Sequence, residues 1–475
     1  MPVADYQIML RELPAVDRLL NEPAVAETMQ DLPRRIVLQA VQETIDSYRK
    51  LINANRADQQ LLTGLNISPA GLASEAVALA FKKARPNIGP VINASGVVIH
   101  TNLGRSPLAP AAVDALADLA ANFNNLELNL DTGKRGSRQD HLEEIICDLT
   151  GAEAAAVFNN NAAAVFLVLN TLTSGLEVIV SRGELVEIGG SFRIPEIMAS
   201  SGARMIEVGT TNKTYRRDYE KVINDRSAAL LKVHTSNYQM VGFTAAVNAA
   251  ELAELAHDRG LIMIEDLGSG VLIETSKYGL PAEPRVQDSI EAGADLVTFS
   301  GDKMLGGPQA GIVVGRKELV GKIKANQMAR VVRVDKFTVA ALEATLRLYY
   351  EEETALREIP VWRMLTANLK YLQQRAEKLA QRIGNIFGTG NVSIIPGISR
   401  VGGGAMPNAE LPTALVAVRL NRGQITPDQL AERLRRGTPP VILRLQQDSL
   451  LFDPRTIFEE QEDALVEALQ KALNL

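Results

Sequence analysis

The chain has 475 residues, more than one compact core usually holds, so we expect two or three domains. Its 46% hydrophobic and 22% charged residues are ordinary for a soluble globular protein. The net charge of −6 argues mildly against a protein that coats nucleic acid.

No run approaches the roughly 18 consecutive apolar residues that a membrane helix needs. The opening MPVADYQIMLREL carries charge too early for a signal peptide. The single cysteine, Cys147, lies in the helical pattern HLEEIICDLTG and is expected in a core. One cysteine excludes an internal disulfide and a cysteine-based zinc site, and we expect no metal. Together these features favour the cytoplasm.

The first ~65 residues are predicted to form a small helical domain. In RRIVLQAVQETIDSYRK, apolar residues recur at steps of four and three positions, which marks one face of a helix: Val37, Val41, Ile45 and Tyr48. The segment LPAVDRLLN is a second, shorter amphipathic piece. Glycine and proline punctuate LLTGLNISPAG (61–71), so we place a helical domain at 1–65 and a linker at 66–90.

Two local groups of basic residues interrupt the otherwise acidic chain. One holds Lys82, Lys83 and Arg85, and the other holds Lys134, Arg135 and Arg138. Runs of this kind are more often a solvated face than a binding patch, and we favour that interpretation for both.

From about residue 150 to 320, short apolar runs alternate with amphipathic stretches such as AAELAELAHDRG. Continuous apolar strands that alternate with helices indicate a mainly parallel sheet covered on both faces, here in a large domain at 91–340. We predict seven strands: AAAVFN (154–159), EVIVSR (177–182), RMIEVG (204–209), AALLKVH (228–234), LIMIED (261–266), DLVTFSG (295–301) and GIVVGR (311–316).

A second α/β cluster follows after about residue 355. The runs ALVAVRL and PVILRL are predicted as strands, and TPDQLAERLRRG and EEQEDALVEALQKALNL as helices. We expect residues 341–475 to form a small C-terminal domain, joined to the large one by the helical stretch FTVAALEATLRLYYEEETALRE.

Polar side chains follow three of the predicted strands. Lys303 comes just after DLVTFSG, Asp266 ends LIMIED, and AAAVFN runs into the asparagines at 159, 160 and 161. Ligands of open parallel sheets bind at the carboxyl ends of the strands. We therefore expect a lysine, a carboxylate and a polar turn at one edge of the sheet.

This combination is what pyridoxal phosphate needs. Its aldehyde requires an amine for a Schiff base, and its pyridine nitrogen requires a carboxylate so that the ring accepts electrons. Its phosphate suits the N-terminus of the helix predicted in NNNAAAVFLVLNTL. We predict that cofactor, bound by a set of residues that also includes a hydroxyl: Lys303, Asp266, Asn159, Asn160, Asn161 and Ser300.

Two other interpretations compete with this one. A nucleotide phosphate loop places its glycines before the lysine and Ser or Thr after it, whereas here Met304 follows Lys303 and the glycines come later. The plainer alternative is an ordinary strand-end lysine, with Asp266 capping a helix. The residues in combination, on strands in this order, favour the cofactor.

Long motifs along the chain resemble those of the bacterial selenocysteine synthases, the L-seryl-tRNA(Sec) selenium transferases of the fold-type-I pyridoxal phosphate enzymes. The similarity starts at LPAVDRLL (13–20), covers the large domain and continues more weakly to the C-terminus. The motifs are SGDKMLGGPQAG (300–311), TNLGRSPLA (101–109), FNNNAAAV (158–165), SRGELVEIGGSFRIP (181–195), EVGTTNKT (207–214), KVHTSNY (232–238) and EDLGSG (265–270).

The resemblance implies conversion of serine, attached to its tRNA, into selenocysteine. Lys303 would hold the cofactor and, once released, carry the Cα proton, while Asp266 would pair with the pyridine nitrogen. Loss of the serine hydroxyl by β-elimination would be followed by addition of selenium from selenophosphate. That donor is a small, highly charged anion, and the resemblance places three arginines around it: Arg105, Arg330 and Arg333.

The resemblance also implies that the N-terminal helical domain grips seryl-tRNA(Sec) and that the enzyme is a homo-oligomer, a ring of five dimers. Without it, Arg330 and Arg333 would be interpreted as a solvated basic helix edge. His234 and Glu187 lie in matching motifs and are candidate pocket residues, for which a structural role stays equally open.

Two alternative functions remain. A fold-type-I enzyme acting on a free amino acid would share Lys303 and Asp266, but it would need neither the N-terminal helices nor three anion-binding arginines. A non-catalytic tRNA-binding relative is disfavoured by the intact lysine, aspartate and asparagine turn.

Overall fold

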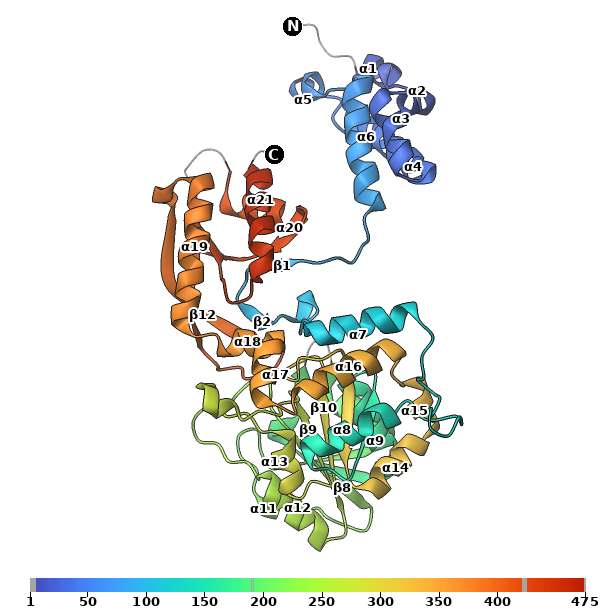
Figure 1. Ribbon diagram of the computed structural model, residues 1–475, viewed down its shortest axis with the longest axis vertical. Coiled ribbons are helices and arrows are strands. Elements are labelled where there is room, and N and C mark those ends of the chain that lie inside the picture. The colour runs from blue at the N-terminus through green and yellow to red at the C-terminus, as the bar shows by residue number, and fades with distance from the viewer. Residues whose placement is uncertain (1–5, 189, 191, 421–424, 474–475) are drawn as a thin grey trace. The chain divides into compact units, whose positions relative to one another are not determined.

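The computed structural model describes residues 6–188, 190, 192–420 and 425–473 (Figure 1). Parts of three predicted segments therefore lie outside the described residues: 1–5 of the N-terminal domain, 189 and 191 of the motif SRGELVEIGGSFRIP, and 421–424 with 474–475 of the C-terminal domain. The chain divides into two compact units, Met1–Pro90 and Val91–Leu475. No helix in the described part of the chain is long and apolar enough to cross a membrane.

The N-terminal unit is helical, as the sequence predicts. It consists of α1 (Tyr6–Glu12), α2 (Val16–Leu20), α3 (Pro23–Asp31), α4 (Arg34–Ala54), α5 (Gln59–Gly64) and α6 (Pro69–Ala84). The apolar face predicted for α4 is buried in the core of this unit.

Helix α6 corrects the predicted linker at 66–90. It packs against α4 through four buried residues: Leu72, Ala73, Ala76 and Ala80. The Ser68 side chain caps its start by accepting a hydrogen bond from the Gly71 N–H, and Pro69 takes the first helical position. Pro69 and Gly71, which were predicted to lie in a linker, thus belong to the first turn of a helix.

The larger unit contains the predicted seven-stranded sheet, of which Figure 1 labels β8, β9 and β10. The order of its strands is β3-β11-β10-β9-β8-β4-β7. Only β11 runs antiparallel to its neighbours. All seven predicted strands are present: β3 (Ala154–Phe158), β4 (Glu177–Ser181), β7 (Arg204–Val208), β8 (Ser227–Val233), β9 (Ile262–Gly268), β10 (Leu296–Ser300) and β11 (Gly311–Gly315).

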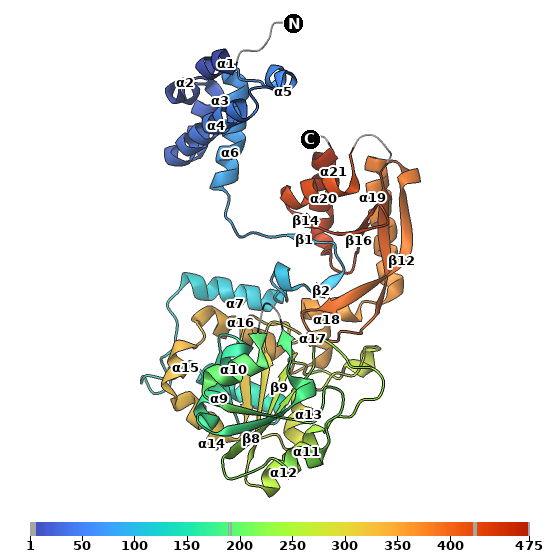
Figure 2. The ribbon, with the colours of Figure 1, turned by 180° about the vertical axis from the view of Figure 1, so that it is seen from behind.

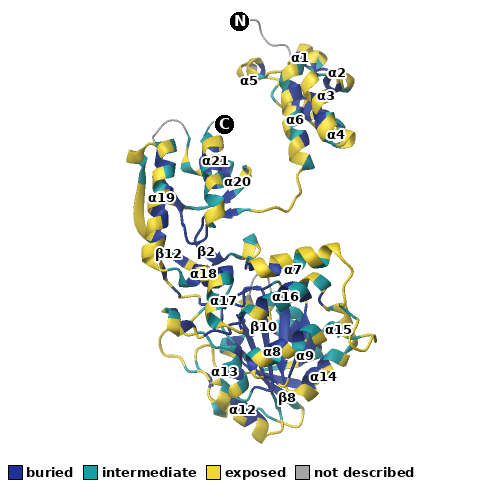
Figure 3. Ribbon diagram, in the orientation of Figure 1, coloured by how far each residue is buried: buried dark blue, intermediate teal, exposed yellow. Residues whose placement is uncertain are grey.

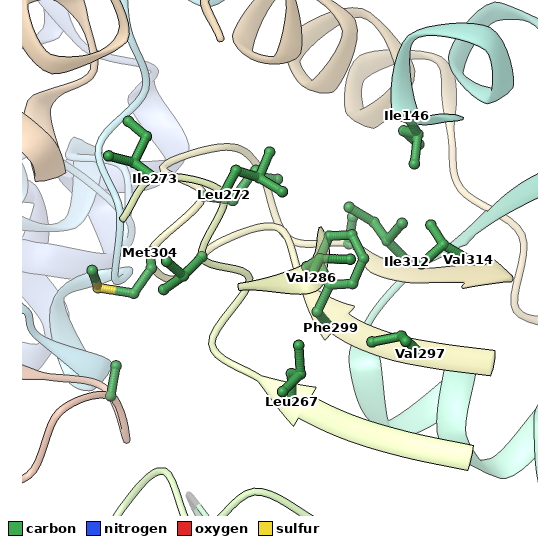
Figure 4. Packing of buried hydrophobic residues seen from close by; sticks show 14 of the residues in the cluster. Ile146, Leu267, Leu272, Ile273, Val286, Val297, Phe299, Met304, Ile312 and Val314 are labelled. Atoms are coloured by element: carbon green, nitrogen blue, oxygen red, sulfur yellow. The ribbon is translucent and has the colours of Figure 1, made fainter. Parts of the chain in front are cut away.

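Helices cover both faces of this sheet, because alternate strand side chains feed two separate cores (Figure 2). One face packs against α8 (Asp140–Thr150), α12 (Ala249–Asp258), α13 (Val286–Glu291) and α16 (Lys336–Leu348). Figure 4 shows part of that core, with Ile146 of α8 near Ile312 and Val314 of β11. The other face packs against α9 (Asn161–Thr173), α10 (Ile194–Ser201) and α14 (Lys317–Ala325). The central strands are consequently buried (Figure 3).

Shorter elements surround the sheet. They are α7 (Pro110–Ala121), α11 (Arg216–Glu220), α15 (Gln327–Val331), α17 (Glu352–Glu358), α18 (Pro360–Thr366) and the hairpin of β5 (Glu187–Ile188) and β6 (Phe192–Arg193). The helical stretch predicted to join the domains is divided between α16 and α17.

The C-terminal part forms a second sheet, in the order β15-β16-β13-β12-β2. Its strands are β12 (Val392–Gly402), β13 (Leu411–Arg419), β15 (Arg444–Gln446), β16 (Ser449–Phe452) and β2 (Val97–Ile99). Its core includes residues of α19 (Leu369–Phe387), α20 (Pro427–Arg436) and α21 (Glu462–Leu473). A separate pair joins β1 (Ile92–Asn93) to β14 (Val441–Ile442).

Strands β1 and β2 revise the predicted boundary at residue 91. Their partners β14 and β12 lie in the C-terminal part, so the chain contributes to the small domain before it enters the large one. The bend between them is tied to that domain, because the Gly96 N–H donates a hydrogen bond to Thr456 Oγ1 at 3.0 Å. Gly96 has φ of +73°, and a Cβ added there would lie 2.0 Å from Asp453 Oδ2.

The variant Gly96→Ala tests this attachment. We expect it to lower the free energy of unfolding by about 1–3 kcal/mol, since the new methyl group meets the fully buried Asp453 and the backbone conformation disfavours a side chain. Gly321→Ala in α14 is the control, because nothing lies within 4 Å of its added Cβ, and it should stabilise by about 0.5–1 kcal/mol. Urea unfolding measures both, and equal effects would contradict the prediction.

Candidate active site

A cavity of about 280 Å³ lies where β8, β9 and β10 end and α9 begins. Six of the nine residues predicted from the sequence line it: Lys303, Asp266, Arg105, Asn160, Asn161 and Ser300. The remaining lining residues are Ala162, Phe192, His234, Gly268 and Gln309. The carboxyl edge of the sheet therefore brings the predicted amine, carboxylate and polar turn together.

Lys303 is buried, with 5% of its surface exposed. Its backbone is held by Ser106, whose hydroxyl donates to the carbonyl oxygens of Asp302 and Lys303 at 2.8 and 2.7 Å. The Gly306 N–H closes the following turn by donating to the Lys303 carbonyl at 3.0 Å. Burial lowers the pKa of the Lys303 amine, and the nearby Asp266 carboxylate opposes that shift.

Gly268, at the end of β9, lies beside the amine of Lys303. A Cβ added there would lie 3.8 Å from Lys303 Nζ, and Gly268 has φ of +65°. Glycine therefore permits this backbone conformation beside the lysine side chain.

Asp266 lies on the floor of the cavity with 3% of its surface exposed. Its Oδ1 accepts hydrogen bonds from Asn161 Nδ2 at 2.8 Å and from Thr298 Oγ1 at 2.9 Å. Burial raises the pKa of Asp266, while these two hydrogen bonds and the Lys303 charge lower it. The carboxylate is thus oriented by two neutral donors from neighbouring elements.

The N-terminus of α9 forms one wall of the cavity. Asn160 caps the helix by accepting a hydrogen bond from the Ala163 N–H at 2.8 Å. A Cβ at position 311 would lie 2.0 Å from the Asn160 carbonyl oxygen, so Gly311 allows β11 to pass close to the turn. The N–H groups of the first helical turn have no partner within a helix and suit a phosphate.

The donor set fits pyridoxal phosphate. A buried lysine of lowered pKa, a buried carboxylate and a capped helix N-terminus face one cavity of suitable chemistry. Among the described residues, Asn161 Oδ1 is buried without a hydrogen-bond partner although its residue lines the cavity, which indicates a polar group to be bound there. The fold and this site define a pyridoxal phosphate-dependent enzyme of fold type I.

Comparison with known proteins identifies the family. Residues 91–458 match the model of the L-seryl-tRNA selenium transferases, and residues 10–49 match that of the selenocysteine synthase N-terminal region. The chain belongs to the L-seryl-tRNA selenium transferase family.

Curated relatives agree with the family match. The L-seryl-tRNA(Sec) selenium transferase of Solidesulfovibrio magneticus is 50% identical, with 98% of each chain covered. That of Nitratidesulfovibrio vulgaris is 48% identical, covering 98% of this chain and 99% of its own length. Among solved structures, a D-glucosaminate-6-phosphate ammonia-lyase aligns with a TM-score of 0.56 at 22% identity, covering 82% of this chain and 96% of that one, which supports the fold.

Three predicted site residues lie outside the cavity lining of the described chain. The Asn159 backbone N–H donates to the Val332 carbonyl at 3.0 Å. Arg330 is exposed on α15, and Arg333 lies 3.7 Å from Glu127 with 40% of its side chain exposed. Of the three arginines, only Arg105 lines the cavity, where it forms a 2.7 Å ion pair with Asp302.

Two other contributors, Thr298 and Glu283, were not predicted, whereas the motif around His234 indicates a pocket residue there. Thr298 lies two positions before Ser300 on β10, and residues two apart on a strand face the same side. The spacing in DLVTFSG could therefore have placed Thr298 on the same side as Ser300. His234 lines the cavity, and its Nε2 lies 3.1 Å from Oε1 of Glu283, a loop residue that no sequence pattern indicated. Glu187 instead pairs with Arg193 at 2.7 Å and does not line this cavity.

The pH dependence of cofactor attachment tests this electrostatic arrangement. Attachment requires the neutral amine, so its rate should rise with pH and reach half-maximum below the ordinary pKa of lysine. Asp266→Asn should move the midpoint to lower pH, because a charge that raises the pKa of Lys303 is removed. Arg105→Met should move it to higher pH for the opposite reason. Borohydride trapping followed by peptide mapping measures the rate, and label on a lysine other than Lys303 would refute the assignment.

Proposed function

We propose that this enzyme converts seryl-tRNA(Sec) to selenocysteinyl-tRNA(Sec), with selenophosphate as the selenium donor, in the cytoplasm. The observation that carries the proposal is the match to the family over both the catalytic region and the N-terminal region, in a chain that retains the buried Lys303 and Asp266. Curated relatives at 46–50% identity bear this activity in their names.

The roles of the residues follow from the cavity. When bound, pyridoxal phosphate would accept the electron pair that is left on the serine Cα as its proton is removed. Asp266 would hold the proton of the pyridine nitrogen, and the α9 N-terminus with Asn160 and Asn161 would bind the phosphate. Ser300 adds a hydroxyl to the same lining.

Lys303 moves the proton. Burial lowers the pKa of the Lys303 amine, which favours the neutral form that accepts the Cα proton. The serine Cβ–O bond then breaks with its electron pair on oxygen, which departs as water after protonation. Selenium from the donor forms the new bond to Cβ and Cα regains a proton, while the Se–P bond breaks and the phosphoryl group passes to water and leaves as phosphate.

The donor site is proposed to include Arg105, Arg330 and Arg333, since a compact multiply charged anion is best held by several guanidinium groups. Because Arg330 and Arg333 are exposed and do not line the cavity of their own chain, we propose that a second subunit brings them to it. Exposed apolar residues accompany them, including Val331 at 70% and Leu130 at 71% exposure. The enzyme would then be a homo-oligomer.

The N-terminal unit is proposed to bind the tRNA. It is compact on its own and presents exposed basic side chains: Arg34, Arg35, Arg49, Lys50 and Arg56. Such residues neutralise phosphates in a salt-dependent manner. Some also have local acidic partners, as in the 3.0 Å pair of Arg49 and Asp46.

An activity assay tests the proposed reaction. The enzyme loaded with pyridoxal phosphate should convert seryl-tRNA(Sec) in the presence of selenophosphate and leave free serine unchanged. Lys303→Ala should reduce conversion by at least about a thousandfold, because both cofactor attachment and proton transfer are lost. Turnover of free serine without turnover of seryl-tRNA(Sec) would instead identify an enzyme of free amino acids.

A shortened chain tests the role of the N-terminal unit. Because α6 belongs to that unit, the chain should start at Val91 rather than near Gly71. We expect it to fold and to bind pyridoxal phosphate, but to lose tight binding of tRNA(Sec). Binding by the full chain should weaken steeply with added salt, as release of counterions requires. Equal affinity of the two chains in a filter-binding assay would contradict the role.

Subunit mixing tests the shared donor site. Lys303→Ala and Arg330→Ala should each be inactive alone, yet random reassembly of the two should restore about a quarter of the sites if the residues come from different subunits. Lys303→Ala mixed with Arg105→Ala is the matched control. It should restore nothing, because these two residues line the same cavity of one chain. Recovery in the control, or none in the test pair, would exclude the shared site.

A further inference from the structure

A second hollow, of about 230 Å³, adjoins the cofactor cavity at the same edge of the sheet. It lies where β4, β7 and β8 end, and its lining includes Ser181, Thr214 and Val233. His234 lines both hollows. A substrate whose reacting part lies at Lys303 therefore has a neighbouring space for the group attached to it.

The floor of this hollow is a buried ion pair. Lys232 Nζ lies 3.2 Å from Glu184 Oε1, and the two side chains are 18% and 10% exposed. Glu184 Oε2 accepts the Val233 N–H at 3.0 Å, and Lys232 also donates to the Val247 carbonyl at 2.9 Å. The charges of this pair compensate each other, and Lys213 adds a further ammonium group to the lining. The Glu184 carboxylate disfavours a compact multiply charged anion such as selenophosphate.

The walls combine hydroxyls and amides with one apolar side. Polar side chains in the lining include those of Thr211, Asn212, Thr235, Gln239 and Thr244. Met240 provides the apolar surface, and its Cε lies 3.3 Å from where a Cβ of Gly183 would be. A nucleoside needs this combination, since its ribose and base edges exchange hydrogen bonds while its base face packs on an apolar or sulfur-containing group.

We propose that this hollow binds the 3′-terminal nucleoside of the acylated tRNA, an inference that rests on the proposed function. The seryl group is esterified to the terminal ribose, so that ribose has to lie within one ester linkage of the amino acid held beside Lys303. The shared His234 places the second hollow next to that position. Seryl-tRNA(Sec) would thus be held at its acceptor end by the catalytic unit itself.

The test compares two amines that bind the holoenzyme. Seryl-adenosine with a 3′-amide link carries the nucleoside, and serinamide lacks it. Calorimetric titration of the full enzyme should show at least about tenfold tighter binding of seryl-adenosine, because the nucleoside adds buried contacts. Equal affinities would overturn the proposal.

A filling variant locates the contact. Ala246 lines the hollow at an exposed position, so Ala246→Trp should fill it without disturbing the core, and Thr244→Phe on the same rim replaces it if folding fails. Either should remove the advantage of seryl-adenosine while leaving serinamide binding and the absorbance of the bound cofactor unchanged. Ala250→Trp, exposed on α12 outside the lining, is the matched control and should keep the advantage. Tight seryl-adenosine binding by the filled variant would refute the site.

The unaltered enzyme is assayed for seryl-tRNA(Sec) conversion in the same preparations. Absence of conversion would refute the proposed function. Whether the hollow binds the nucleoside is decided separately, by the ratio of the affinities for seryl-adenosine and serinamide in the filled and unaltered enzymes.

Discussion

Burial of the Lys303 amine is the constraint on which the active site depends. A buried ammonium group is costly unless it is paired or loses its proton, and here its pKa is lowered by burial and partly restored by Asp266. The surrounding chain makes that burial possible. Ser106 holds the backbone at the lysine, Gly268 permits a left-handed backbone conformation beside Nζ, and the Gly306 N–H closes the turn after the lysine. The glycine turn that follows the lysine in the sequence thus helps to hold Lys303 in place.

Much of this arrangement is predictable from the sequence, because it follows from strands and their ends. The seven strands are buried on both faces, so each appears in the sequence as a continuous apolar run that is easy to recognise. Since parallel strands end at a common edge, Lys303 and Asp266 could be placed together without knowing the strand order. The pairing of β2 with β12 was not predictable. A three-residue strand carries little pattern of its own, and β2 is stabilised by a partner about 300 residues away in the sequence.

The placement of charge was harder to predict than the fold. Arg330 and Arg333 lie in a basic segment whose surroundings within one chain are solvent and Glu127, so their proposed role depends on a neighbour that local patterns cannot reveal. Glu283 reaches His234 from an irregular loop, where no periodicity predicts direction. In contrast, Asp266 belongs to a regular strand, and its contact with Thr298 follows from the pairing of β9 with β10.

The link between β2 and Arg105 has a mechanical consequence. Ile99 ends a strand of the small sheet, and only six positions later Arg105 reaches the cavity of the large domain. The intervening turn is stiff, because both Leu103 and Arg105 donate backbone hydrogen bonds to the His100 carbonyl, at 2.9 and 3.1 Å. The pairing of β2 with the small sheet thus constrains where Arg105 lies in the cavity of the large domain. A single short turn makes the position of this side chain depend on both sheets.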